Sequence, residues 1–167
     1  MLKTGGNPVS AVLLLSVNIA VLLGAYGFEI VGGLAPCQLC YYQRAPYFLA
    51  ILACSAAWLR PAWARSMFAL LTPIYFTSAS LGLYHAGVEW KFWPGPASCT
   101  ALGNSNIPVE ELLAQILAAP IVRCDEIPWS LFGISLAGYN ALISVGLLAA
   151  AASAFVHETR RRKNGDV

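Results

Sequence analysis

Four long stretches of apolar residues follow one another along the chain, and the charged residues fall mainly between them or at the two ends. A helix that crosses a hydrocarbon core of about 30 Å needs about 20 predominantly apolar residues. The pattern therefore predicts four transmembrane helices, over residues 9–28, 41–59, 66–88 and 129–156. The second reaches full length only if Arg44 extends its charged head toward the membrane interface.

The segments between these helices are short, except for one. Residues 29–40 and 89–128 fall on the same side of a four-helix arrangement. In the longer loop, apolar residues recur at helical spacing over 108–117, which predicts a short amphipathic helix on the membrane surface. The expected fold class is therefore all-α integral membrane, a bundle of four transmembrane helices with one amphipathic helix in the second outer loop.

Composition supports this setting. Of 167 residues, 58% are hydrophobic and 11% are charged, whereas a soluble domain carries about 25% charged residues. The net charge is +2, without the basic patch that nucleic-acid binding requires. We therefore expect residues 1–167 to form a single membrane domain that contacts the lipid bilayer and binds no nucleic acid.

Basic residues are distributed unevenly between the two sides of the predicted bundle. One side carries Lys3, Arg60, Arg65, Arg160, Arg161, Arg162 and Lys163, and the other carries Arg44, Lys91 and Arg123. Cytoplasmic segments of membrane proteins have an excess of Lys and Arg. We expect the first side, with both termini, to be cytoplasmic.

Four of the five cysteines then face the non-cytoplasmic side. Cys37 and Cys40 lie in the first outer loop, and Cys99 and Cys124 lie in the second. Disulfides persist in such oxidising compartments. Cys54 stands in the middle of a predicted helix and is interpreted as a small buried hydrophobic residue.

Three chemistries compete for the Cys-x-x-Cys pair of Cys37 and Cys40. A c-type haem requires histidine directly after the second cysteine, but Tyr41 stands there. A structural zinc site requires four nitrogen or sulfur ligands in closely spaced pairs, and Cys99 and Cys124 are far apart without a neighbouring histidine. We therefore interpret the pair as a redox dithiol and expect no metal.

Arg44 lies one helical turn beyond Cys40, near the expected start of a helix. A helix N-terminus and a nearby guanidinium each favour a thiolate. We therefore expect Cys40 to be the reactive thiolate beside Arg44. The alternative for Arg44 is an interfacial anchor.

The second pair, Cys99 and Cys124, has two interpretations. It could be a structural disulfide that closes the long loop, or a second exchangeable disulfide. A redox dithiol on the same side favours exchange.

A dithiol that oxidises partners must pass its electrons on. The sequence contains no flavin motif, no Cys-x-x-Cys-His and no further dithiol cluster, so a lipid-soluble quinone is the expected acceptor. Arg44 and His85 are expected at similar depth, where a cation or an imidazole could hydrogen-bond a quinone carbonyl. The alternative for His85 is an interfacial histidine bonded to Tyr84 or to a backbone carbonyl.

Three segments resemble the DsbB family of bacterial inner-membrane disulfide bond formation proteins: "PCQLCYYQR" at 36–44, "YHAGVEWKFWPGPASC" at 84–99, and "RCDEIPWSLFGISLAGYN" at 123–140. The resemblance implies periplasmic cysteine loops and a DsbA-like periplasmic thiol oxidase as partner. It also implies a membrane quinone, ubiquinone in preference to menaquinone, as cofactor.

The resemblance further implies a role for each site residue. DsbA attacks a Cys99–Cys124 disulfide at Cys99, the Cys37–Cys40 disulfide then takes up the electrons, and Cys40 passes them to the quinone. Arg44 and His85 bind that quinone. The alternatives are a DsbB-type or vitamin K epoxide reductase-like enzyme for a dedicated thiol partner, and a non-enzymatic membrane scaffold with structural disulfides.

Overall fold

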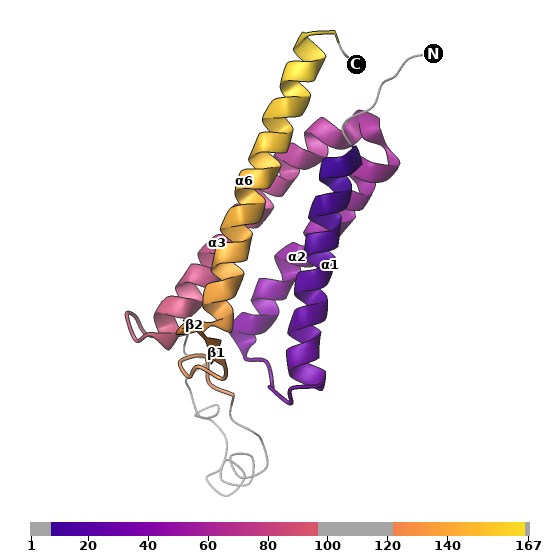
Figure 1. The fold of residues 1–167 in the computed structure, drawn as a ribbon. Helices are drawn as coiled ribbons and strands as arrows, with labels where there is room; N and C mark the ends of the chain where they lie inside the picture. Colours follow the sequence, from indigo (N-terminus) through magenta and orange to yellow (C-terminus); the bar gives the residue numbers. More distant parts are fainter. Residues whose placement is uncertain (1–7, 97–121, 166–167) are drawn as a thin grey trace, which may run out of the picture.

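A computed structural model describes residues 8–96 and 122–165 of the chain. Its long helices are α1 (Pro8–Ile30), α2 (Gln38–Leu59), α3 (Ala64–Glu89) and α6 (Leu136–Lys163). A single 3₁₀ turn, Pro61–Trp63, joins α2 to α3, and Pro61 at its first position favours such a start. In Figure 1, α6 runs alongside α3 while α1 runs alongside α2.

Three of these helices, α1, α3 and α6, are long and apolar enough to cross a membrane. The all-α architecture with several membrane-spanning candidates agrees with the expected class of an all-α membrane protein. Helix α2, with 22 residues, is not among these three, so the four-span count stays a prediction. The amphipathic helix expected over 108–117 lies outside the described residues.

The fourth predicted helix begins later than expected, at Leu136 instead of position 129, because a hairpin precedes it. Strands β1 (Ser130–Leu131) and β2 (Ile134–Ser135) pair antiparallel around Phe132 and Gly133. Both turn residues have positive φ, 51° and 78°, as a two-residue type I′ turn requires. The Ser135 side chain then accepts a hydrogen bond from the Gly138 N–H and caps α6.

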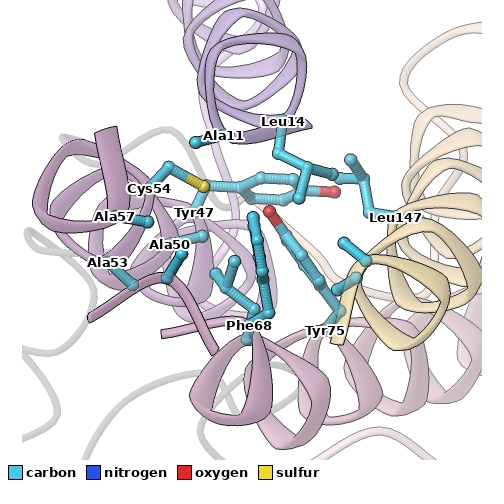
Figure 2. Packing of buried hydrophobic residues seen from close by; sticks show 14 of the residues in the cluster. Ala11, Leu14, Tyr47, Ala50, Ala53, Cys54, Ala57, Phe68, Tyr75 and Leu147 are labelled. Carbon is cyan, nitrogen blue, oxygen red and sulfur yellow. The ribbon is translucent and has the colours of Figure 1, made fainter. Parts of the chain in front are cut away.

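The core of the bundle is built from small residues and a few large aromatic ones. Figure 2 shows Ala50, Ala53 and Ala57 of α2 facing Phe68 and Tyr75 of α3. Small residues let membrane helices approach closely, and the aromatic rings fill the remaining space. Many large apolar side chains point outward instead, as expected for a surface that contacts lipid.

The basic α2–α3 turn and the basic end of α6 meet in space. Arg65 Nε lies 3.1 Å from Thr159 Oγ1, and Arg162 Nη2 lies 2.8 Å from the carbonyl oxygen of Ala62. The α2–α3 turn and the end of α6 therefore lie at one end of the bundle, while the Cys-x-x-Cys pair and the hairpin lie at the other (Figure 1). Lys3 lies outside the described residues.

Candidate functional site

The Cys-x-x-Cys pair lies at the start of α2, where a helix end leaves backbone N–H groups without partners. Cys37 is the N-cap, and its sulfur accepts a hydrogen bond from the Cys40 N–H at 3.3 Å. The two sulfurs are 2.9 Å apart, and both cysteines are free. Cys37 is buried and Cys40 is partly exposed. The pair is therefore a dithiol in this structure, and the sulfur of Cys37 is the acceptor that caps α2.

Cys37 carries the perturbed thiol of the pair. A hydrogen bond from the Cys40 side chain lowers the pKa of Cys37 to about 4, with further lowering from His85 and from the Cys40 backbone N–H, while burial opposes the shift. The geometry favours Cys37 as the thiolate of the pair, because the Cys40 backbone N–H and the His85 ring both face its sulfur. This differs from the sequence interpretation, which assigned the thiolate to Cys40.

His85 of α3 reaches the dithiol from the side. Its Nε2 lies 3.5 Å from Cys37 Sγ, and its Nδ1 accepts a hydrogen bond from Gln43 Nε2 at 2.6 Å. Gln43 Oε1 accepts from Asn140 Nδ2, which fixes the orientation of this amide. The ring proton is then on Nε2 and points toward the thiolate. The alternative interpretation gave His85 a bond to Tyr84 or to a backbone carbonyl, but in the structure its ring bonds the side chain of Gln43 on α2.

The same chain of hydrogen bonds continues into the bundle. Tyr47 donates its hydroxyl proton to Asn140 Oδ1 at 2.5 Å. The Tyr47 oxygen lies 2.9 Å from Ser144 Oγ, which lies 2.8 Å from Ser78 Oγ. Because Tyr47 has a single proton to give, Ser144 donates to it and Ser78 donates to Ser144. A relay of aligned donors therefore runs from α3 and α6 through α2 toward His85, and such alignment strengthens each bond.

Glu89 is a buried carboxyl group that the sequence interpretation did not consider. It lies one turn after His85 on α3, is 5% exposed, and places Oε1 3.9 Å from His85 Nε2. The Ser135 hydroxyl donates to its other oxygen, so the residue that caps α6 also orients Glu89. The available signal was its position, one turn from a histidine at the end of an apolar helix.

Arg44 is not extended into solvent. It is 7% exposed, its Nη1 lies 2.6 Å from Glu29 Oε2 of α1, and its guanidinium lies over the rings of Tyr26 and Tyr41. Glu29 thus balances the charge that was expected to act on Cys40. A guanidinium has five N–H donors, so Arg44 retains donors beyond the one directed at Glu29.

A cavity of about 590 Å³ opens between α1, α2 and α6 beside the dithiol, within the range of about 300–1,000 Å³ common for ligand sites. Apolar residues of α1 line much of it. The polar and redox residues in its wall include Cys40, Gln43, Arg44, His85, Glu89 and Asn140. Arg44 and His85, predicted from sequence to share a site, do line the same cavity.

The second pair is described only at Cys124, because Cys99 lies outside the described residues. Cys124 is disulfide-bonded and fully buried. It belongs to a small cluster with Cys37, Leu39 and Val88, which we call the Cys37 cluster. The fold thus brings Cys124 against the first pair.

Ion pairs hold the segment around Cys124 to the end of α3. Lys91 Nζ lies 2.6 Å from Asp125 Oδ2 and also donates to the Asp125 carbonyl oxygen. Arg123 makes two hydrogen bonds to the same carboxylate. Hydrogen bonds from Arg123, then from Lys91, hold the pKa of Asp125 well below its usual range.

Known proteins resemble this chain over most of its length. A family model described as "Disulfide bond formation protein DsbB" matches residues 8–154. A protein of Pseudomonas syringae named "Disulfide bond formation protein B 2" is 31% identical over 144 residues, 80% of each chain. One of Idiomarina loihiensis named "Disulfide bond formation protein B" is 31% identical over 150 residues, 85% of this chain and 81% of its own. An uncharacterised protein of Rickettsia prowazekii is 27% identical over 150 residues, covering 88% and 87% of the two chains.

Proposed function

The chain belongs to the DsbB family of disulfide bond formation proteins, and on that basis we propose that it reoxidises a periplasmic dithiol oxidase of the DsbA type and passes the electrons to a membrane quinone. The observation that carries this proposal is the meeting of three features at one end of the bundle: the Cys37 thiolate, the buried Cys124 disulfide and the cavity beside Cys40.

The proposed setting is the bacterial inner membrane, which α2 crosses together with α1, α3 and α6, so that both termini lie in the cytoplasm. The basic residues of the α2–α3 turn and of the last turn of α6 support this orientation. The cysteine end of the bundle then faces the periplasm, where disulfides persist.

The partner's electrons enter at the second pair. We assign a disulfide between Cys99 and Cys124, and a thiolate of the partner attacks Cys99 to form a mixed disulfide. That attack breaks the Cys99–Cys124 bond and releases Cys124 as a thiolate. The partner's second thiolate then attacks the partner sulfur of the mixed disulfide, which forms the partner's own disulfide and releases Cys99 as a thiolate. Cys99 and Cys124 retain the two electrons as a dithiol.

Exchange between the pairs runs through the Cys37 cluster. Cys124 attacks Cys37 of the oxidised first pair, which forms a Cys37–Cys124 bond and releases Cys40 as a thiolate. Cys99 then attacks Cys124, which restores the second disulfide and releases Cys37. The burial of Cys37 and Cys124 in one cluster supports this order, as does the place of Cys40 in the cavity wall.

The cavity fits a quinone head group in size and in chemistry. A bound quinone would supply an acceptor of two electrons and two protons. The Arg44 guanidinium and the amide of Gln43 offer hydrogen-bond donors for carbonyl oxygens, and His85 lies beside them. Ubiquinone and menaquinone both present such carbonyls, and ubiquinone is our first choice.

Turnover by the purified protein in lipid nanodiscs tests the proposal. With ubiquinone and a reduced DsbA-type protein, we expect one quinol per partner disulfide. Cys37→Ser should abolish turnover, whereas the control Cys54→Ala should retain it, since Cys54 lies in the core away from the cavity. Full turnover by Cys37→Ser would favour a scaffold whose disulfides are structural.

A further inference from the structure

The fold assembles a set of metal-ligating groups that is not evident from the sequence. Cys37 and Cys40 are three residues apart on α2, and His85 and Glu89 are one turn apart on α3. The sulfur atoms of the two cysteines and a ring nitrogen of His85 all lie within 4.8 Å of one another. Structural zinc sites draw their ligands from two such closely spaced pairs. The sequence interpretation discounted zinc because it paired Cys37 and Cys40 only with Cys99 and Cys124.

The distances suit a tetrahedral ion after a small movement. Zn–S bonds of about 2.3 Å and Zn–N bonds of about 2.0 Å place sulfur and nitrogen ligands about 3.5 Å apart, and Cys37 Sγ lies 3.5 Å from His85 Nε2. The two sulfurs, now 2.9 Å apart, must separate by about 1 Å to reach tetrahedral spacing. Cys40 lines the cavity, which gives its side chain room for this movement.

Glu89 is placed to complete the set. Its Oε1 lies 3.9 Å from His85 Nε2, and Ser135 holds its other oxygen. Second-shell hydrogen bonds of this kind orient ligating carboxylates in metal sites.

We propose that the reduced protein binds one Zn²⁺ through Cys37, Cys40, His85 and Glu89, and that the bound ion holds the first pair reduced. The ion remains divalent throughout, and no electrons are transferred. Two Zn–S bonds, one Zn–N bond and one Zn–O bond form in place of bonds from the ion to water, and any proton still held by a ligating group is released to solvent. The disulfide form cannot bind the ion in this way, because both sulfurs are then bonded to each other.

Zinc binding also requires a change in the hydrogen-bond relay. His85 ligates through Nε2 only if its ring proton moves to Nδ1, where Gln43 must then accept it. Rotation of the Gln43 and Asn140 amides by 180° achieves this, since their oxygen and nitrogen ends have nearly the same shape. The Tyr47 hydroxyl then accepts from Asn140 and donates to Ser144. The donors and acceptors of this relay can thus point in either of two directions. One direction directs the His85 ring proton to the Cys37 thiolate, and the other leaves Nε2 free to bind the ion.

Metal titration of the full-length protein tests the inference. In a Cys99→Ser, Cys124→Ser background, only Cys37, Cys40 and Cys54 carry thiols. Zn²⁺ in competition with a chromophoric chelator should bind the reduced protein at one equivalent. Co²⁺ should give a sulfur-to-metal charge-transfer band that disappears after oxidation. Should this double variant fail to fold, the difference in bound Zn²⁺ between reduced wild type and reduced Cys37→Ser gives the same stoichiometry.

Substitutions then identify the ligands. We expect His85→Ala to weaken binding by more than the 10–100-fold that is typical of second-shell changes, and Glu89→Gln to weaken it by about 10-fold. Cys54→Ala should leave it unchanged. Equal binding by the oxidised and reduced proteins, or by His85→Ala and its parent, would overturn the inference.

The inhibitory consequence rests on the proposed function, whereas zinc binding does not. If the protein oxidises its partner, Zn²⁺ should slow turnover and a chelator should restore it. Binding without turnover by any quinone would disprove the proposed function alone. Turnover by a reduced protein that binds no Zn²⁺ would disprove this inference alone.

Discussion

Helix α2 carries cysteine at two depths, and the two environments differ in every respect that controls thiol chemistry. Cys37 caps the helix, accepts a backbone N–H and faces His85. Cys54 is fully buried among alanine, Phe68 and Tyr75 in the core (Figure 2). A helix N-terminus and aligned hydrogen-bond donors thus make Cys37 reactive, whereas apolar packing keeps Cys54 inert.

The regions around these two cysteines are also held together by different interactions. The site end of the bundle, around Cys37, is specified by long-range hydrogen bonds, such as those of Gln43 and Glu89. The core, around Cys54, is specified by close packing of small and aromatic side chains. Changes in the core should therefore affect stability, and changes at the site should affect thiol chemistry.

The largest effect is expected in the core. Phe68 is fully buried, and Phe68→Ala should lower the free energy of unfolding by about 3–5 kcal/mol, since it removes a large side chain and leaves a cavity. Thermal unfolding in detergent can be followed through thiol labelling of Cys54. The control Phe76→Ala removes an outward-facing ring on the same helix and should cost much less. Equal losses would contradict the assignment of Phe68 to the core.

A smaller loss is expected where α3 meets α6. A methyl group at Gly82 would lie 2.8 Å from the backbone nitrogen of Ala141, whereas one at Gly146 would meet nothing within 4 Å. Gly82→Ala should therefore destabilise the protein by about 1–3 kcal/mol. Gly146→Ala should be neutral or slightly stabilising, since alanine favours a helix. The same unfolding assay compares them.

At the site, His85→Ala should raise the pKa of Cys37, because His85 contributes to its lowering. A rise of one unit shifts the midpoint of the thiolate titration up by one pH unit. Alkylation of Cys37 in the reduced protein, measured by mass spectrometry between pH 4 and pH 7, reports the thiolate fraction. His157→Ala should leave the profile unchanged, since His157 is exposed near the end of α6 that meets the α2–α3 turn, away from the cysteines. An unaltered profile in His85→Ala would remove His85 from this role.

The smallest effect concerns the ion pairs beside Cys124. The lowered pKa of Asp125 means that these pairs stabilise the segment above the usual pKa of aspartate, and that this contribution is lost as pH falls through the folded value. Asp125→Asn should modestly speed proteolysis of residues 122–128 at neutral pH and low salt. High salt should narrow the difference, because exposed charges are screened. Glu126→Gln is the matched control, and a difference that persists in high salt would exclude the ion-pair explanation.

The apolar pattern was sufficient to predict long helices over most of their observed lengths. The start of α6 was not predictable in this way, because a two-residue turn at Phe132 and Gly133 interrupts an uncharged run. The amphipathic helix and the role of Cys99 stay predictions, since both fall outside the described residues.

At the site, sequence spacing identified the cysteines and placed Arg44 beside Cys40, but the partners of these residues come from other helices. Glu29 of α1 takes the Arg44 charge, and His85 of α3 reaches Cys37. The spacing of residues along the sequence predicts contacts within one helix, but not contacts between helices. The assignment of the thiolate to Cys37 therefore required the tertiary structure.

The pH dependence of the midpoint potential of the Cys37–Cys40 couple tests the account most directly. With Cys37 already a thiolate, reduction takes up one proton for two electrons, and the potential should fall by about 30 mV per pH unit between pH 5 and pH 8. An ordinary dithiol takes up two protons and gives about 59 mV per pH unit. A slope near the larger value across this range would contradict the structural assignment of Cys37.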